Sequence, residues 1–197
     1  MKIKVWEAAL IAAVMLSILA GSAAGAQREL SEKLIRLHVV AASDSEADQE
    51  LKLKVRDAVL KAADGLLAGA EDAREAEEML SDGLPEIKIA ADTAVKDNGY
   101  DYPVTVTLGR ESFPTREYDT FSLPAGDYTS LRVTIGEGKG KNWWCVCYPP
   151  LCESAAVSFE DAGLTDKQVM LITGDSDGVK VKFFALEMLQ KLKGLFV

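Results

Sequence analysis

The hydrophobic period of the chain changes once, and this change constrains the fold more than any other feature. From Glu46 to about Val95 apolar residues recur at steps of three and four, which indicates amphipathic helices. From Tyr102 to Tyr148 apolar and polar residues alternate in short segments, which is typical of strands with one buried face. Helical segments followed by strands predict an α+β fold, with helices packed on a mainly antiparallel sheet.

Local signals place the individual elements. Ser45 is positioned to cap the first helix. A second helix is expected over Glu71–Ser81, ended by Asp82-Gly83, and Pro85 is expected to begin a third. Strands are predicted at Leu34–Ala41, Tyr102–Leu108, Arg116–Leu123 (closed by a turn at Pro124–Asp127), Leu131–Ile135, Trp143–Tyr148 and 179–183, with a short helix or strand at Thr165–Ile172 and a closing helix at Ala185–Leu195.

The N-terminus has the anatomy of an export signal. Lys2 and Lys4 precede an uncharged stretch that ends in Ala24-Gly25-Ala26, an A-x-A cleavage pattern. The stretch is just long enough to act as an uncleaved anchor, but its second half is mostly Gly, Ala and Ser, which favours cleavage before Gln27. Residues 1–26 are therefore expected to be a signal peptide or signal anchor, with membrane contact only through them if they are uncleaved. Residues 27–197 are expected to form a single α+β domain outside the cytoplasm.

The charge of the chain argues against nucleic acid as a partner. The formal net charge is −9, and binding to a phosphate backbone requires clustered cations. Lys52, Lys54, Arg56 and Lys61 are interleaved with acidic residues at helical spacing, so a solvated helix face is predicted for them.

One stretch, Val133–Cys152, combines alternating glycines, two adjacent tryptophans and all three cysteines. Its G-x-G-x-G-K pattern is followed by neither the Ser or Thr nor the helix of a P-loop, which favours a glycine turn between two strands. Trp143 and Trp144 point to opposite faces of a regular strand, so one is expected in the core and the other could anchor a partner. Burial of both tryptophans remains an open alternative.

The cysteines allow three kinds of chemistry. Three cysteines and His38 supply the ligands of a Cys₃His zinc site, but Cys145 and Cys147 are separated by one residue where zinc knuckles use two. A Cys–His nucleophile is the second possibility, although exported cysteines are more often paired than reactive. The third is a disulfide from Cys152 to either Cys145 or Cys147. No catalytic residue, metal site or cofactor is assigned, and a secreted cysteine- or zinc-dependent hydrolase is kept as the alternative function.

Three segments resemble the stage II sporulation protein R family of endospore-forming bacteria. They are IRLHVVAASDSEADQELKLKVRDAVL (Ile35–Leu60), NGYDYPVTVTLG (Asn98–Gly109) and LPAGDYTSLRVTIGEGKGKNWWCVCYPPLC (Leu123–Cys152). The resemblance implies a signal that is made in the forespore and exported into the space between forespore and mother cell. There it would activate a membrane-bound aspartic protease that processes pro-sigma-E, without catalysis or a small-molecule substrate of its own.

The resemblance also bears on individual residues. It implies that Cys145 pairs with Cys152, because Cys147 stands at a position that is usually apolar in the family, which makes it an extra thiol. Ala42 likewise departs from an Asn found in family members. As a hypothesis based on a rigid tip that core packing does not need, the partner-binding residues are Gly138, Lys139, Lys141, Asn142, Trp143 and Trp144.

Overall fold

The computed structural model describes residues 25–118, 121–151 and 164–173, together with the isolated positions 6, 10 and 21. The chain divides into two compact units. One contains Ser31–Glu111 and Tyr128–Gly163, and the other contains Met1–Leu30, Ser112–Asp127 and Leu164–Val197. The prediction of a single domain over residues 27–197 stays a prediction.

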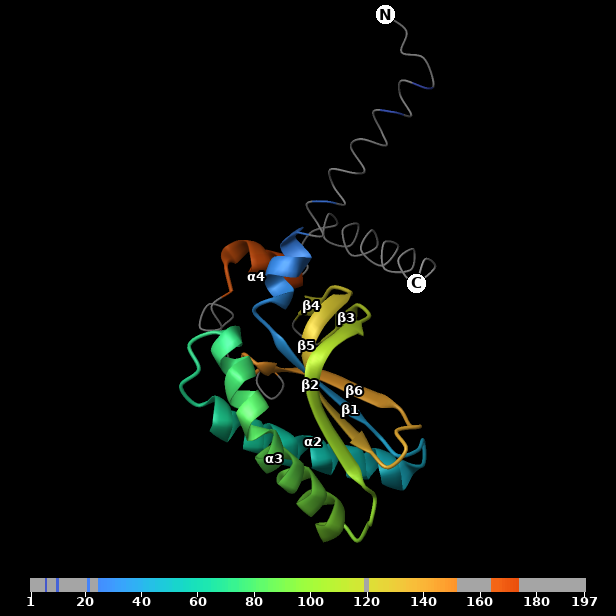
Figure 1. Cartoon of the computed structure of the whole chain (residues 1–197). Helices are drawn as coiled ribbons and strands as arrows, with labels where there is room; N and C mark the ends of the chain where they lie inside the picture. Colours follow the sequence, from blue (N-terminus) through green and yellow to red (C-terminus); the bar gives the residue numbers. More distant parts are fainter. Residues whose placement is uncertain are drawn as a thin grey trace, which may run out of the picture. The chain divides into compact units, whose positions relative to one another are not determined.

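Most of a four-stranded sheet with the order β2-β5-β1-β6 lies in the larger unit (Figure 1). Its strands are β1 (Ile35–Val40), β2 (Val104–Phe113), β5 (Gly126–Ile135) and β6 (Asn142–Tyr148). β1 runs parallel to β5 and antiparallel to β6. The sheet is mixed and mainly antiparallel, and the predicted α+β class is confirmed. The parallel pair was not predicted; it arises because the chain crosses over the end of β1 between β5 and β6.

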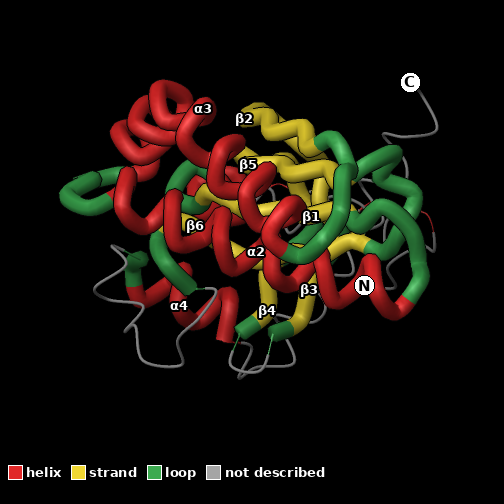
Figure 2. The backbone as a smooth tube through the Cα atoms, turned by 90° about the horizontal axis from the view of Figure 1, so that it is seen from below, coloured by secondary structure: helices red, strands yellow, loops and turns green. Residues whose placement is uncertain are grey.

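Two helices, α2 (Glu46–Leu67) and α3 (Ala73–Asp97), pack together on one face of this sheet, as Figures 1 and 2 show from two directions. Leu37 and Val39 of β1 lie in the same buried cluster as the apolar stripes of both helices, so the predicted periodicity marks the core correctly. The remaining buried members include Leu51, Val55, Val59, Leu80, Ile87, Ala91, Val95, Leu131, Val133 and Ile135.

The predicted break between a second and a third helix is wrong. α3 continues through Gly83 and Pro85 without interruption. A Cβ atom at Gly83 would overlap the Leu66 side chain, so the glycine allows α2 and α3 to approach closely and does not end the helix. Pro85 has no N–H, so the Ser81 carbonyl loses its usual helical hydrogen bond. Both residues are exposed, and water can therefore bond to this carbonyl instead.

The smaller unit contains a two-stranded sheet and a short helix. β3 (Arg116–Glu117) pairs antiparallel with β4 (Ser122–Leu123), and α4 (Asp166–Thr173) contacts β4. The single strand predicted over Arg116–Leu123 is therefore two strands, because the Tyr118 N–H donates to the Phe121 carbonyl at 2.7 Å and reverses the chain. The turn expected at Pro124–Asp127 is only a bend that leads into β5.

The ambiguous segment near Thr165 is a helix, whereas the strand predicted at 179–183 and the closing helix at Ala185–Leu195 lie outside the described residues. Nearly all of the predicted leader also lies outside them. Among the residues that the structure describes, none of the helices combines the length and apolar composition needed to cross a bilayer.

Candidate functional site

The alternating glycines form a crossover between two strands. This glycine loop, Gly136–Lys141, joins β5 to β6 and passes over the carboxyl end of β1, which lies between them. Gly136 and Gly138 have positive φ angles of 58° and 63°, which side chains rarely adopt. A strand follows the loop where a P-loop would have a helix. The glycines therefore have a structural explanation that requires no phosphate.

Backbone contacts fix the glycine loop to the segment that follows β1. The Gly140 N–H donates to the Ala41 carbonyl at 2.9 Å, and the Lys139 N–H donates to the Ala42 carbonyl at 3.3 Å. A Cβ atom at Gly140 would overlap the Ser43 carbonyl, so only glycine permits this approach. Two stretches that are almost a hundred positions apart in the sequence are thus brought into direct contact.

The segment Ser43–Asp48, here called the serine–aspartate segment, supplies the other half of the site. Ser45 caps α2 as predicted, since its hydroxyl accepts from the Asp48 N–H at 3.2 Å. Ser43 donates its hydroxyl to the Asp48 carboxylate at 2.5 Å. Asp44 accepts from the Lys141 N–H at 2.8 Å, which ties the segment to the glycine loop. Asp48 also lies near Tyr102, and its negative charge raises the pKa of that phenol.

Lys52 lies beneath these contacts, and the solvated environment predicted for it is wrong. The residue is only 5% exposed, and its ammonium donates to Gln49 Oε1 at 2.6 Å and to the Lys141 carbonyl at 3.2 Å. Burial lowers the pKa of Lys52, and the nearby Asp44 charge partly opposes that effect. Lys54 and Lys61 are exposed, as the charge pattern predicted. Lys52 therefore serves as an internal tie between α2 and the glycine loop.

The two tryptophans of β6 lie on opposite faces of the sheet, and both are partly buried. Trp143 packs against the helix-side core, and the Arg56 guanidinium lies 4.4 Å from its ring centroid. Trp144 stacks on His38 with ring centroids 5.5 Å apart. The six residues predicted to bind a partner therefore do not form one surface.

Among those six, Lys139, Lys141 and Asn142 are exposed and adjacent at the tip. Gly138 has a backbone role, since it combines a positive φ with close contact to Thr134. Trp144 lies on the face opposite the helices and stacks on His38, which also contacts Asn142 of the tip.

His38 is part of a polar cluster that the sequence did not reveal. One ring nitrogen is 2.8 Å from Glu111 Oε1, and the other is 2.9 Å from Asn142 Oδ1. Glu111 also pairs with Arg132 at 3.1 Å. The alternation of β1 could have placed His38 opposite the core face, but its hydrogen-bond partners come from β2 and β6, and Arg132 of β5 joins the cluster through Glu111. Only the tertiary fold brings these strands together.

The cysteines differ in state and access. Cys145 is disulfide-bonded, whereas Cys147 is a free, buried thiol whose Sγ lies 3.4 Å from the Ile35 carbonyl oxygen. Burial raises the pKa of Cys147 to about 12. Cys152 lies outside the described residues, so its pairing with Cys145 stays a prediction.

The geometry of the sheet separates the cysteines from the histidine. Cys145 and Cys147 belong to the helix-side core together with Leu37 and Val39, so His38, which lies between those two residues on β1, points to the other face. Over residues 25–118, 121–151 and 164–173, no three His, Cys, Asp or Glu side chains are grouped so that they could hold a metal ion.

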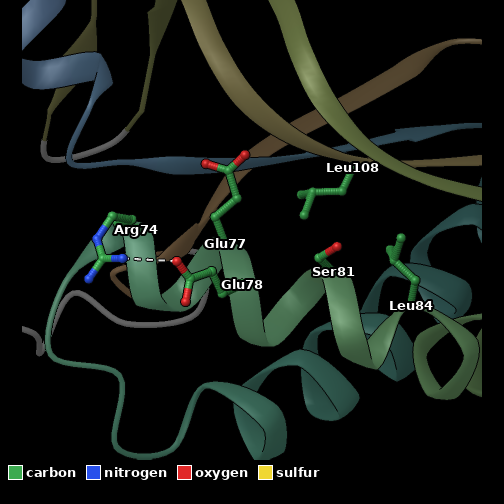
Figure 3. A pocket seen from close by; sticks show the side chains of 6 residues that line it. All are labelled: Arg74, Glu77, Glu78, Ser81, Leu84 and Leu108. Carbon is green, nitrogen blue, oxygen red and sulfur yellow. Dashed lines mark hydrogen bonds and ion pairs between the residues drawn. The ribbon is translucent and has the colours of Figure 1, made fainter.

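A groove between α3 and β2 was also not foreseen. It has a volume of about 380 Å³ and is lined by Arg74, Glu77, Glu78, Ser81, Leu84 and Leu108 (Figure 3). The exposed positions of α3 resembled an ordinary solvated face in the sequence. The groove depends on the position of β2 beside α3, which the helical period does not encode.

Comparisons with known proteins agree with the sequence resemblance. A family model described as stage II sporulation protein R matches residues 31–158, a range that includes both the glycine loop and the serine–aspartate segment. Stage II sporulation protein R of Bacillus subtilis (strain 168) is 34% identical over 185 residues, which cover 83% of this chain and 83% of that protein. No solved structure matches the chain.

Proposed function

The chain belongs to the stage II sporulation protein R family, and on that premise we propose that it is an exported sporulation signal that activates a membrane-bound aspartic protease by binding to it. Activation leads to processing of pro-sigma-E in the mother cell. The protein acts in the space between the forespore and mother-cell membranes. The observation that carries the proposal is the family match along residues 31–158, which covers α2, α3 and the four-stranded sheet.

Two features support an extracytoplasmic location. The first is the leader anatomy of residues 1–26, with its positive start, apolar middle and A-x-A end. The second is the disulfide at Cys145, since disulfides persist mainly in oxidising compartments. Pairing of Cys145 with Cys152 would close a short loop next to β6 and hold the chain after Tyr148 in place.

The arrangement of the thiols favours binding over hydrolysis. A cysteine nucleophile must be accessible and readily deprotonated, whereas Cys147 is buried with a pKa of about 12. Its side chain and His38 lie on opposite faces of the sheet, so they do not form a nucleophile–base pair. A cysteine- or zinc-dependent hydrolase would therefore require a rearranged sheet.

The tip of the glycine loop is the proposed receptor contact. Lys139, Lys141 and Asn142 are exposed there, and Asn142 contacts His38, on which Trp144 stacks. The backbone contacts to Ala41 and Ala42, together with the Asp44–Lys141 contact, hold the tip in one conformation before binding. Such preorganisation lowers the entropic cost of association. Activation requires that this surface bind the active form of the protease more tightly than the inactive form.

The test adds purified residues 27–197 to cells that carry the protease and pro-sigma-E, and follows shortening of pro-sigma-E by immunoblot. Wild-type protein is expected to trigger processing. Reversing two tip charges, with Lys139→Glu and Lys141→Glu together, is expected to lower processing about tenfold or more by removing complementary charge from the interface.

Lys61→Glu with Lys54→Glu is the matched control, because it makes the same change of charge on exposed positions of α2. This control should retain activity. Absence of processing with folded wild-type protein would refute the proposed function. A fully active tip variant would refute only the contact surface.

A further inference from the structure

The outer edge of β2 is open in the part of the chain that the structure describes. β2 ends the order β2-β5-β1-β6, and no described strand pairs with its outer side. Sheet edges expose N–H and C=O groups that can pair with another chain, and proteins usually protect them with charges, prolines or bulges. Between Val104 and Gly109, β2 contains no charged residue and no proline. Over these six residues, and as far as the described residues show, the edge carries none of those protective features.

The groove beside α3 reaches the same strand at Leu108 and combines negative charge with apolar side chains. Figure 3 shows the Glu77 side chain extending from α3 toward the strands, and Leu108 of β2 facing α3. Leu84 adds a second apolar contact.

The charges in the groove are not balanced. Arg74 pairs with Glu78 at 2.9 Å, so these two charges offset each other. Glu77 accepts a long hydrogen bond of 3.3 Å from the Thr129 hydroxyl. Because a hydroxyl carries no charge, this contact does not neutralise the Glu77 carboxylate. One turn further along α3, the Ser81 carbonyl lacks its usual helical donor because Pro85 has no N–H. The Glu77 carboxylate is thus the acceptor in the groove that suits a Lys or Arg side chain.

We propose that the outer edge of β2 and this groove bind an extended segment of a partner protein by strand addition. Main-chain pairing with Val104–Gly109 supplies affinity that does not depend on sequence. Alternate side chains of an added strand point to one face about 7 Å apart. One Lys or Arg therefore reaches Glu77, and an apolar residue two positions away packs on Leu84 and Leu108.

This inference deepens the proposed function, and it rests on that proposal only in taking the receptor as the source of the segment. The glycine-loop tip and the β2 edge are then two contacts of one partner. Strand addition also lets the receptor recognise the signal through main-chain hydrogen bonds. Such bonds depend little on which side chains the receptor segment carries.

The test uses two synthetic peptides and hydrogen exchange measured by mass spectrometry on residues 27–197. The first peptide is acetyl-TKTLTVT-amide, and the second replaces its lysine with glutamate. The lysine peptide is expected to slow exchange in β2 at concentrations on the order of 1 mM, while the glutamate peptide binds about tenfold more weakly.

A charge swap in the protein makes the test sharper. Glu77→Lys should reverse the order, so that the glutamate peptide becomes the better ligand. Glu86→Lys makes the same change at an exposed position of α3 that does not line the groove, and it should leave the order unchanged.

Failure of either peptide to protect β2, protection confined to another strand, or equal protection by both peptides would overturn the proposal. An unchanged order with Glu77→Lys would do the same. The measurement needs no protease, so its outcome is independent of whether the protein activates one.

Discussion

At the scale of single residues, the site is held by groups whose roles depend on what they touch. Lys52 resembles a surface lysine in the sequence, but it is buried and joins α2 to the glycine loop. Gly140 resembles a flexible turn residue, but glycine is required there because a Cβ atom would overlap the Ser43 carbonyl. A sequence pattern identifies such residue types correctly. It does not show which backbone atoms will lie 2–3 Å away after folding.

Gly140→Ala should destabilise the protein by roughly 1–3 kcal/mol, because the added methyl overlaps backbone atoms that cannot move aside cheaply. Gly65→Ala is the matched control. Gly65 lies within α2 with open space around it, and there alanine should stabilise by about 0.5–1 kcal/mol through helix propensity. Urea unfolding measures both. Equal effects of the two substitutions would contradict the close approach of the two loops.

Cys147 gives a prediction about pH. Its pKa is raised from 9.0 to about 12 in the folded protein, so above pH 9 the unfolded state loses this proton first. Stability from this group is therefore fully present below pH 9 and falls as pH rises toward 12. At pH 10 the loss relative to pH 8 should be roughly 1 kcal/mol.

Urea unfolding of the wild type and of Cys147→Ala at pH 8 and pH 10 tests this prediction. The alanine variant lacks the ionisable thiol and should show a smaller decrease between the two pH values. A native thiol that reacts rapidly with a thiol reagent at pH 8 would contradict the burial on which the shift depends.

At the scale of elements, much of the fold could be predicted and the errors have physical causes. The 3.6-residue period identified the core faces of α2 and α3, a largely apolar run identified β1, and alternation identified β2, β5 and β6. Gly83 and Pro85 were misjudged because local signals for a helix end were outweighed by packing on Leu66 and by solvent access at Pro85. Strand order and the parallel pair depend on long-range contacts that periodicity does not contain.

A double-mutant cycle tests the close packing of the two helices. Gly83→Ala alone combines a gain in helix propensity with overlap on Leu66, whereas in a Leu66→Ala background only the gain remains. In the Leu66→Ala background, the change in the free energy of unfolding caused by Gly83→Ala should therefore be at least about 1 kcal/mol more favourable than in the wild type. Denaturant midpoints of the four proteins measure this coupling. Additive effects would show that Gly83 does not contact Leu66 in solution.

At the scale of the whole molecule, the protein is acidic, with a formal net charge of −9, and it exposes Lys139 and Lys141 at the glycine-loop tip, where Lys139 pairs with Glu137. The candidate tip was predictable because glycines, lysines and aromatic residues cluster in one stretch. The β2 edge and the α3 groove were not predictable, because an open edge becomes visible only when the strand order is known.

The central claim is that the protein signals by binding, and the dose dependence of activation tests it most directly. Vesicles containing a fixed amount of the protease are supplied with pro-sigma-E on the side of its catalytic domain, and residues 27–197 are titrated on the opposite side. The account predicts that the rate of pro-sigma-E cleavage rises with the amount added, reaches a plateau at a fixed ratio to the protease, and falls when the added protein is washed away. Full activation by trace amounts that persists after washing would contradict it, because that behaviour requires a covalent change made by an enzyme.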